Sequence, residues 1–207
     1  MELVTGGAGF IGSHLVDSLV AQGKRVRVLD NFSSGREEFL SHHSDSGMVE
    51  VVRADLLLDL ESVKSAMNGV ETVHHMAANP DIRLGTEVTD TDLRQGTIAT
   101  YNVLESMRLA GVGRISFSSS SAVYGEAVQM PTPETYGPIK PISLYGASKL
   151  ASEALITAWC GTFGAKAWIH RFANIVGPRG THGVIYDFVH KLRADPTRLE
   201  VLGDGLQ

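Results

Sequence analysis

The most constraining feature of this 207-residue chain is a glycine-rich turn close to its N-terminus. A short apolar run over residues 2–5 precedes it, and residues 10–22 behind it have helical periodicity. A strand, a tight turn and a helix in this order let the backbone approach a pyrophosphate, whose charge a helix N-terminus favours. The segment therefore predicts a dinucleotide site. The residues expected to hold the cofactor there are Gly6, Gly9, Phe10, Ile11 and Gly12.

Short β-rich runs alternate with helical stretches along the rest of the chain. This alternation is typical of a parallel sheet covered by helices on both faces, so we expect an α/β fold with a doubly wound, Rossmann-type sheet. The expected strands are 2–5, 25–30, 49–53, 72–76, 114–118 and 166–172, and the expected helices are 10–22, 58–67, 90–110, 144–163 and 184–193.

The pattern changes behind residue 173. We predict a dinucleotide-binding domain over 1–173 and the start of a substrate-binding domain over 174–207. Residues 199–202 are expected to begin a further strand, and a turn signal at 203–205 is followed by almost nothing. We therefore expect the C-terminal substrate-binding region to be incomplete and its pocket to be open on one side.

Composition excludes several classes of protein. The net charge of −5 gives no basic footprint for nucleic acid or an anionic membrane. No apolar run reaches the length of a membrane-spanning helix and no signal peptide is visible, so we expect a cytoplasmic protein. The single cysteine excludes an intrachain disulfide. The eight histidines are scattered without a ligand spacing, so no metal site is expected.

Two acids follow predicted strands. Asp30 ends the second strand, where it can accept hydrogen bonds from a ribose diol and would repel a 2′-phosphate, which favours NAD over NADP. Arg36 follows six residues later, and its positive charge keeps NADP as an alternative cofactor. Asp55 follows the third strand and can accept the adenine amino group, but an acid in this place is nearly as often a helix cap or an exposed turn residue.

A tyrosine and a lysine carry the predicted chemistry. Tyr145 and Lys149 are four residues apart, which places them on one face of the predicted helix 144–163. A free phenol has a pKa of about 10. A nearby ammonium favours the phenolate, so such a pair can form a base that works near neutral pH. Alone, the same spacing is typical of an ordinary exposed helical face.

A run of serines, 118–121, lies at the end of the predicted fifth strand. Ligands of such sheets bind at the carboxyl ends of the strands, so a hydroxyl there can hold a substrate oxygen near Tyr145. A serine run is also common in plain loops.

Together these segments resemble the NAD-dependent epimerase/dehydratase family of the extended short-chain dehydrogenases/reductases, and most closely its 4-epimerases of UDP-hexoses. They occur in the family's order and span nearly the whole chain. The segments that carry the resemblance are 6–12, 30–35, 54–56, 75–78, 118–125, 145–149 and 171–174.

The resemblance implies NAD as cofactor and a nucleotide sugar as substrate. UDP-glucose and UDP-galactose would be interconverted by transient oxidation and re-reduction at C4. Tyr145 would be the base and later the acid on the sugar 4-hydroxyl. Lys149 would hold the nicotinamide ribose and lower the tyrosine pKa, and Ser120 would assist the proton transfer. A homodimer through helices 90–110 and 144–163 is also implied.

The resemblance assigns further residues to the two ligands. Segments 182–185 and 201–203 fall where family members line the diphosphate and uracil pocket. The cofactor contacts would be Asn31, Ser33, Gly35, Asp55, Leu56, Ala77, Ala78, Ser118, Tyr145, Lys149 and Pro178, beside the glycine turn and Asp30. The substrate contacts would be Ser120, Ser121, Tyr145, Asn174, Val184 and Ile185.

The chain departs from the family pattern in places, and alternatives stay open. Dehydratases of the family carry Asp-Glu where Ser121 and Ala122 stand, which argues against elimination of water. Gly96 stands where relatives commonly have Asn. A nucleotide-sugar reductase or decarboxylase on the same scaffold remains an alternative. A dinucleotide-binding module without turnover is another, and the early stop favours it.

Overall fold

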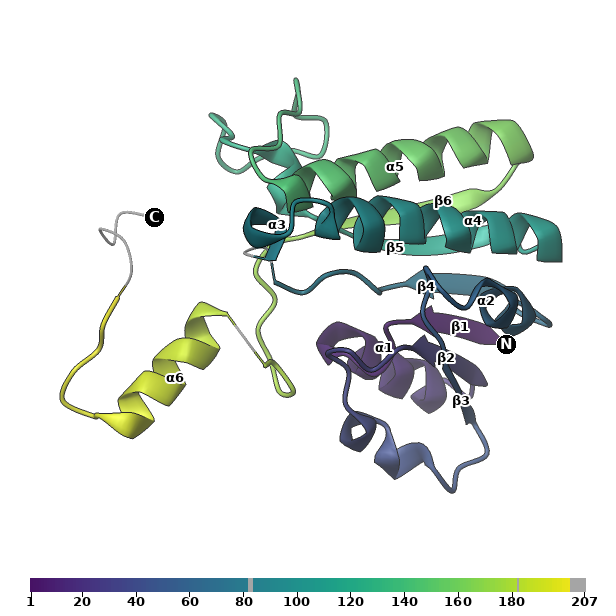
Figure 1. The fold of residues 1–207 in the computed structure, drawn as a ribbon, viewed down its shortest axis with the longest axis horizontal. Helices are drawn as coiled ribbons and strands as arrows, with labels where there is room; N and C mark the ends of the chain where they lie inside the picture. The colour runs from purple at the N-terminus through teal and green to yellow at the C-terminus, as the bar shows by residue number, and fades with distance from the viewer. Residues whose placement is uncertain (82–83, 182, 202–207) are drawn as a thin grey trace. The chain divides into compact units, whose positions relative to one another are not determined.

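A computed structural model describes residues 1–81, 84–181 and 183–201. Its centre is a six-stranded sheet in the order β3-β2-β1-β4-β5-β6, with every neighbouring pair parallel (Figure 1). The strand order reverses beside β1, so the crevice between β1 and β4 is the place where this type of sheet binds ligands. The strands are β1 Glu2–Thr5, β2 Val26–Asp30, β3 Val49–Arg53, β4 Thr72–His75, β5 Arg114–Ser120 and β6 Lys166–Phe172.

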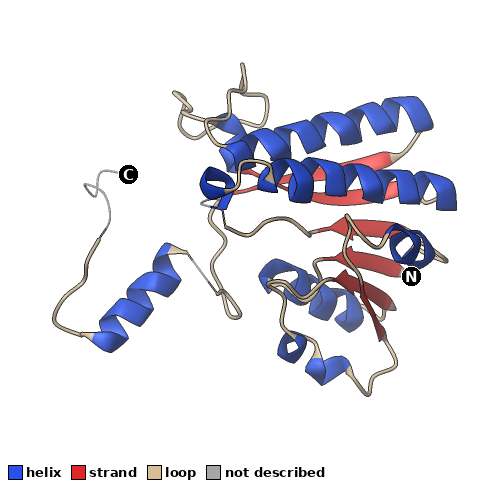
Figure 2. Ribbon diagram, viewed as in Figure 1, coloured by secondary structure: helices blue, strands red, loops and turns tan. Residues whose placement is uncertain are grey.

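Helices cover both faces of the sheet, as the alternation predicts (Figure 2). Helix α1 packs on β1 and β2. On the opposite face, α4 contacts both α2 and α5, and these three helices cover the other core. The α-helices are α1 Phe10–Ala21, α2 Leu60–Ala66, α3 Leu84–Glu87, α4 Ala99–Ala110, α5 Leu144–Phe163 and α6 Val184–Ala194. The shorter helices are η1 Glu37–Phe39, η2 Ser41–His43, η3 Leu93–Ile98 and η4 Ser121–Tyr124.

Alternation along the strands creates two apolar cores. In β1, Leu3 faces the core beneath α2, α4 and α5, and its neighbour Val4 faces the core beneath α1. Successive side chains of a strand point to opposite faces, so β1, β2 and β3 each contribute to both cores, whereas β5 and β6 contribute to the core beneath α2, α4 and α5. This double burial holds the strands in register and aligns their carboxyl ends at one edge of the sheet.

The chain divides into two compact units, Met1–Ala173 and Asn174–Gln207. The first contains the whole sheet. The second contains α6, and the Lys191 ammonium donates to the Glu200 carbonyl at 2.9 Å, which ties the segment behind the helix back to it. Among the described residues, no helix has the length and apolar character that a membrane crossing requires.

Two expected elements differ from the structure. The helix expected over 90–110 is not uniform, because its first part, η3, is π-helical and only the part from Ala99 is α-helical. Gly96 of η3 lies so close to Ser148 of α5 that a Cβ atom would approach the Ser148 hydroxyl to 2.6 Å, a tertiary contact that periodicity does not reveal. Residues 199–201 form no strand, and Leu202 lies outside the described residues.

Candidate functional site

The glycine turn joins β1 to α1 and packs tightly against the end of β4. Gly6 has a left-handed φ of 67°, and a Cβ atom there would lie 2.7 Å from the backbone nitrogen of Ala77. Only glycine combines this φ with this approach. Gly9 is the N-cap of α1 and offers no side-chain cap, and the first turn carries no acid. The first N–H groups of α1 are therefore left to an external acceptor such as a phosphate.

Asp30 lies at the end of β2, beside this turn. Its carboxylate is nearly buried and accepts hydrogen bonds from the backbone N–H groups of Ala8 at 2.9 Å and Phe32 at 2.8 Å. Gly35 folds back over it, so closely that a Cβ atom would lie 2.9 Å from Asp30 Oδ1. A carboxylate has about four acceptor sites, which leaves capacity for a ribose diol.

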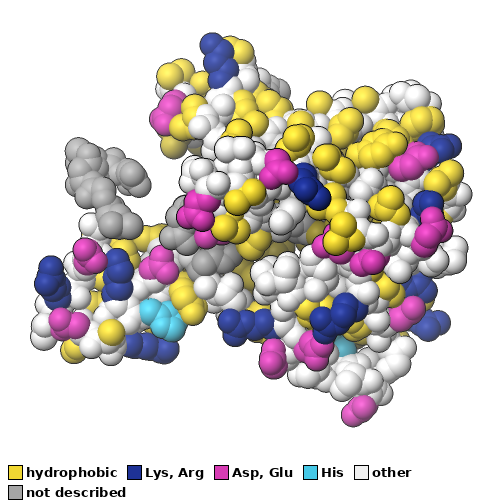
Figure 3. Space-filling view, in the orientation of Figure 1, with side chains coloured by type: hydrophobic (Ala, Val, Ile, Leu, Met, Phe, Trp, Pro, Cys, Tyr) yellow, Lys and Arg dark blue, Asp and Glu magenta, His cyan; other side chains and the backbone are white. Residues whose placement is uncertain are grey.

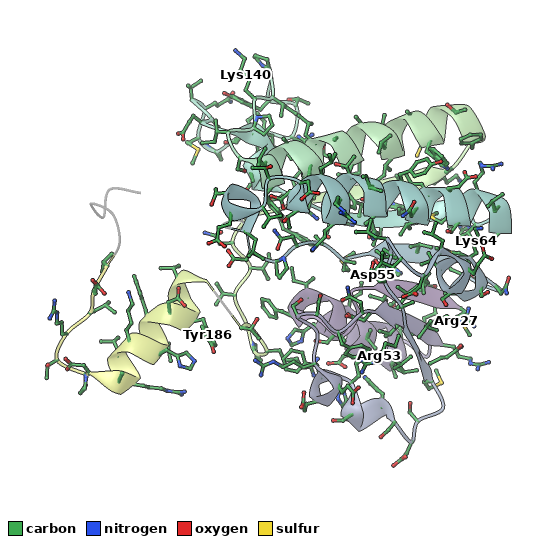
Figure 4. All side chains as sticks on the ribbon, viewed as in Figure 1. Arg27, Arg53, Asp55, Lys64, Lys140 and Tyr186 are labelled. Atoms are coloured by element: carbon green, nitrogen blue, oxygen red, sulfur yellow. The ribbon has the colours of Figure 1, made fainter. Side chains whose placement is uncertain are left out.

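The polar residues that follow β2 and β3 are hydrogen-bonded to one another. Asn31 Nδ2 donates to Asp55 Oδ2 at 2.7 Å, and Asn31 Oδ1 accepts from the Ser33 N–H at 3.0 Å. The other oxygen of Asp55, which Figure 4 labels, accepts from the Leu57 N–H at 2.7 Å. Asp55 is thus a turn-stabilising acid with spare acceptor capacity, and its contact with the adenine amino group stays a prediction. Leu56 is buried, and its carbonyl accepts from Asn102 at 2.8 Å.

The start of α5 lies against the end of β5. Ser143 caps α5 by accepting from the Gly146 N–H at 3.0 Å. A Cβ atom on Gly146 would lie 2.6 Å from the Ala122 carbonyl oxygen, so the helix approaches η4 as closely as glycine allows. This approach places the Ser120 hydroxyl close enough to the Tyr145 phenol to lower the pKa of that phenol. Two residues that are 25 positions apart in the sequence are thereby neighbours in the structure.

Lys149 lies one turn further along α5 and is 3% exposed. Its ammonium donates to the Ser118 carbonyl at 2.6 Å and lies 5.7 Å from the centre of the Tyr145 ring. Burial lowers the pKa of Lys149 to about 8, although the Asp92 carboxylate opposes that effect. The lysine is therefore held by a strand carbonyl, in reach of the tyrosine ring.

The pKa of Tyr145 is raised, whereas the sequence predicts that it is lowered. Burial raises the pKa of Tyr145, the Ser120 hydrogen bond lowers it, and the negative charge of Asp92 raises it further. The expectation that Lys149 lowers this pKa is not met, because desolvation dominates and the ammonium is directed to the Ser118 carbonyl. A lowered phenol pKa needs a further positive charge beside the ring.

Asp92 is a site residue that the sequence did not single out. It is 1% exposed, and its Oδ1 accepts from Asn79 Nδ2 at 3.0 Å. Among the described residues its Oδ2 has no hydrogen-bond partner. Its charge acts on both Tyr145 and Lys149. In the sequence it is one of several acids around a helix start, so no local signal marks it.

An ion pair braces the same region from the side of β6. Arg171 donates to the Glu153 carboxylate through Nε at 3.0 Å and Nη2 at 2.7 Å, and through Nη1 to the Tyr124 hydroxyl at 3.1 Å. The Ser119 hydroxyl also donates to Glu153. The pair links α5, β5, β6 and η4, which are the elements that set Tyr145 beside Ser120.

The buried His75 of β4 connects β1 to α4. Its Nδ1 lies 2.7 Å from the Thr5 hydroxyl at the end of β1, and its Nε2 lies 3.1 Å from the Thr100 hydroxyl of α4. Burial, aided by the positive charge of Lys149, lowers the pKa of His75 to about 3. The ring is therefore neutral at physiological pH and serves as a hydrogen-bonding spacer.

The first unit thus gathers most of the predicted residues at one edge of the sheet. The glycine turn, Asp30, Asn31, Ser33, Gly35, Asp55 and Leu56 follow β1 to β3, Ala77 and Ala78 follow β4, and Ser118, Ser120, Ser121, Tyr145 and Lys149 lie at the β5 end and the start of α5.

Four predicted residues belong to the second unit. Asn174, Pro178, Val184 and Ile185 are exposed there, so their roles stay predictions. Of the two segments predicted to line the diphosphate and uracil pocket, His182, Leu202 and Gly203 lie outside the described residues.

Comparison with known proteins points to one family. Residues 2–207 match the model of the NAD dependent epimerase/dehydratase family. The chain is 36% identical to a UDP-glucose 4-epimerase of Mycolicibacterium smegmatis, over 98% of this chain and 66% of that protein. It is also 36% identical to UDP-glucuronic acid decarboxylase 4 of Arabidopsis thaliana, over 99% of this chain and 46% of that protein.

Solved structures agree with this result. A crystal structure of a UDP-galactose 4-epimerase superposes with a TM-score of 0.85 at 48% identity, over 94% of this chain and 63% of that one. The Thermus thermophilus UDP-glucose 4-epimerase in complex with NAD superposes with a TM-score of 0.82 at 35% identity, over 91% and 60%. The chain thus spans two thirds or less of the length of these similar proteins.

Proposed function

This chain belongs to the NAD-dependent epimerase/dehydratase family, and we propose that it is the catalytic part of a UDP-hexose 4-epimerase that uses NAD as a retained cofactor. The observation that carries the proposal is the placement of Tyr145 beside Ser120, with Lys149 buried one helical turn away at the carboxyl edge of the sheet. A hydroxyl, a phenol and an ammonium in this arrangement suit proton transfer to and from an alcohol.

The residues of the first unit fit the dinucleotide. The N–H groups at the start of α1 would bind the pyrophosphate, and Asp30 would accept from the adenosine ribose. Asn31, Ser33 and Gly35 would border that ribose, Asp55 and Leu56 would border the adenine, and Ala77 and Ala78 line the crevice between β1 and β4. When bound, NAD supplies a hydride acceptor and, in its oxidised form, a positive charge.

Tyr145 would exchange the proton of the sugar 4-hydroxyl. In its phenolate form it takes that proton, and as the phenol it returns one to the 4-oxygen after the sugar has turned over. Ser120 donates to or accepts from the same oxygen and keeps it within reach of Tyr145. Lys149 would bind the nicotinamide ribose. Because burial raises the phenol pKa, the base becomes effective only with a positive charge near its ring.

The sugar specificity rests on similarity and on a few residues. Ser121 and Ala122 offer no acid at the position where dehydratases carry a pair of acids, which favours epimerisation over elimination of water. Asn174, Val184, Ile185 and Pro178 would contribute to the nucleotide-sugar site from the second unit, as the start of a substrate-binding domain. Decarboxylation of UDP-glucuronate is the second candidate, because a UDP-glucuronic acid decarboxylase is 36% identical to this chain.

Product analysis separates these functions. The protein is incubated with NAD and either UDP-galactose or UDP-glucuronate, and the nucleotide sugars are resolved by chromatography. We expect UDP-glucose from UDP-galactose and no pentose product from UDP-glucuronate. A pentose product would replace the proposed function by the second candidate. No product from either substrate, with NAD bound, would favour a binding module without turnover.

We also propose a homodimer through α4 and α5. Hydrophobic side chains gather over these two helices (Figure 3). Tyr101, Leu109 and Phe163 are each about half exposed there, and Trp159 lies 4.8 Å from Phe163 between ring centres. Exposed aromatic residues of this size are typical of protein interfaces. Sedimentation at several protein concentrations tests the dimer, and a monomer at high micromolar concentration would contradict it.

A further inference from the structure

Two neighbouring histidines converge on one carboxylate, away from the residues assigned to the cofactor. His42 and His43 form η2, and Asp17 lies in the middle of α1. His42 Nε2 lies 2.8 Å and His43 Nε2 2.7 Å from the same oxygen, Asp17 Oδ1. One ligand atom from each residue lies within 4.8 Å of the other two. The residues are 25 positions apart in sequence, so their spacing does not reveal the cluster.

The orientation of the two rings is unusual for sequence neighbours. Consecutive residues of a 3₁₀-helix project about 120° apart, since each turn contains three residues. Here the ring centres are only 4.0 Å apart, and both rings present Nε2 to Asp17. His43 is buried and His42 is about half exposed at its side chain, so one ligand is fixed by packing and the other can adjust.

The donor set selects the class of ion. Two imidazole nitrogens and a carboxylate oxygen are ligands that Zn²⁺ and its neighbours in the first transition series prefer, whereas Mg²⁺ and Ca²⁺ prefer oxygen alone. We propose that Asp17, His42 and His43 form a zinc site, with water completing the coordination. Nothing in the sequence motifs or the proposed epimerase function uses these three residues.

The geometry requires only a small adjustment. Zinc lies about 2.0–2.1 Å from imidazole nitrogen, so tetrahedral ligand atoms are about 3.3 Å apart. The observed separations from Asp17 Oδ1 would widen by about 0.6 Å, with the ion replacing the shared protons. The backbone of η2 is held meanwhile, because the His43 carbonyl accepts from the Ser46 N–H at 3.0 Å and the Ser46 hydroxyl at 2.7 Å. A bound ion would therefore tie the connection after β2 to α1.

Isothermal titration with ZnCl₂ in a weakly coordinating buffer at pH 7.5 tests the site. We expect one Zn²⁺ per chain, and at least tenfold weaker binding in His42→Gln and in Asp17→Asn. His190→Gln, which removes a histidine of α6, is the matched control and should bind as the wild type does. At pH 5.5 the wild type should bind at least tenfold more weakly, because imidazole ligands must be deprotonated.

Either of two titration results would overturn the proposal. One is the absence of stoichiometric Zn²⁺ binding, and the other is an affinity that is the same in wild type, His42→Gln and Asp17→Asn. If a variant fails to fold, the wild type alone decides through the ¹⁵N resonances of its histidine rings. Zinc should move the Nε2 resonances of His42 and His43 and leave those of His75 and His190 in place, and unchanged His42 and His43 resonances contradict the site.

Discussion

At the scale of single residues, the site depends on how one phenol is charged. Tyr145 faces the Ser120 hydroxyl, the Lys149 ammonium and the Asp92 carboxylate. Burial and Asp92 both disfavour the phenolate, and the Ser120 hydrogen bond favours it. Sequence spacing could indicate that Tyr145 and Lys149 share a helical face. It could not indicate the buried acid, because Asp92 reaches the pair only through the packing of η3 on α5.

Replacing this acid should shift the pH dependence of catalysis. Asp92→Asn removes a negative charge, so the pKa of Tyr145 falls and its reactive phenolate form persists to lower pH. We expect the acidic limb of the kcat/KM profile to move down by about one pH unit. Asp90→Asn, which removes an exposed acid from the same segment, is the control and should leave the profile in place. If the acidic limb of the kcat/KM profile of Asp92→Asn stays in place or moves to higher pH, this electrostatic role is contradicted.

At the scale of elements, helix contacts set the relative positions of the proposed catalytic groups. Periodicity predicted α5 and five of the strands to within one residue at each end, because alternation and helical spacing are local signals. The sixth, β5, continues two residues beyond the prediction, to Ser120, because those serines pair with Arg171 and Phe172 of β6. The π-helical η3 and the short α3 depend on tertiary packing, and no pattern in the sequence predicted them.

Two glycines of α5 offer a matched test of this packing. In Gly146→Ala the new methyl group would lie 2.6 Å from the Ala122 carbonyl, so α5 must move away from η4 and draw Tyr145 away from Ser120. We expect a loss of about 1–3 kcal/mol in the free energy of unfolding and at least a tenfold loss of kcat. Gly161→Ala meets nothing within 4 Å and should stabilise the helix by about 0.5–1 kcal/mol. Urea unfolding and steady-state rates measure both, and equal behaviour of the two variants would refute the argument.

At the scale of the whole molecule, the sequence indicated the class of fold, the family and NAD, and the structure and the comparisons confirm these three. Glycine turns and strand-end acids carry such signals because the phosphate site needs them locally. Contacts between distant segments could not be predicted from the sequence, because local patterns carry no information about them. His75 with Thr100 and the ion pair of Arg171 with Glu153 exist only because the sheet order brings their strands and helices together.

Buried His75 should make the stability of the protein depend on pH. Its pKa is about 3 in the folded protein and about 6.5 when unfolded, so between these values only the unfolded state binds the proton. The free energy of unfolding should therefore fall by roughly 1.4 kcal/mol per pH unit from this residue as pH drops below 6.5. Above pH 6.5 the residue has no such effect. Urea unfolding of wild type and His75→Gln from pH 4 to 7.5 measures it, and parallel curves for the two proteins would contradict the assignment.

In the proposed reaction, Tyr145 in its phenolate form accepts the sugar proton while hydride passes from C4 to the bound NAD. The most direct measurement mixes NAD-loaded protein with UDP-glucose and follows the absorbance of reduced nicotinamide in wild type and in Tyr145→Phe. The variant keeps the ring and loses only the hydroxyl. We predict that reduction is at least about a hundredfold slower in Tyr145→Phe, with NAD affinity within a few fold of wild type. Reduction at the wild-type rate in the variant would contradict the claim.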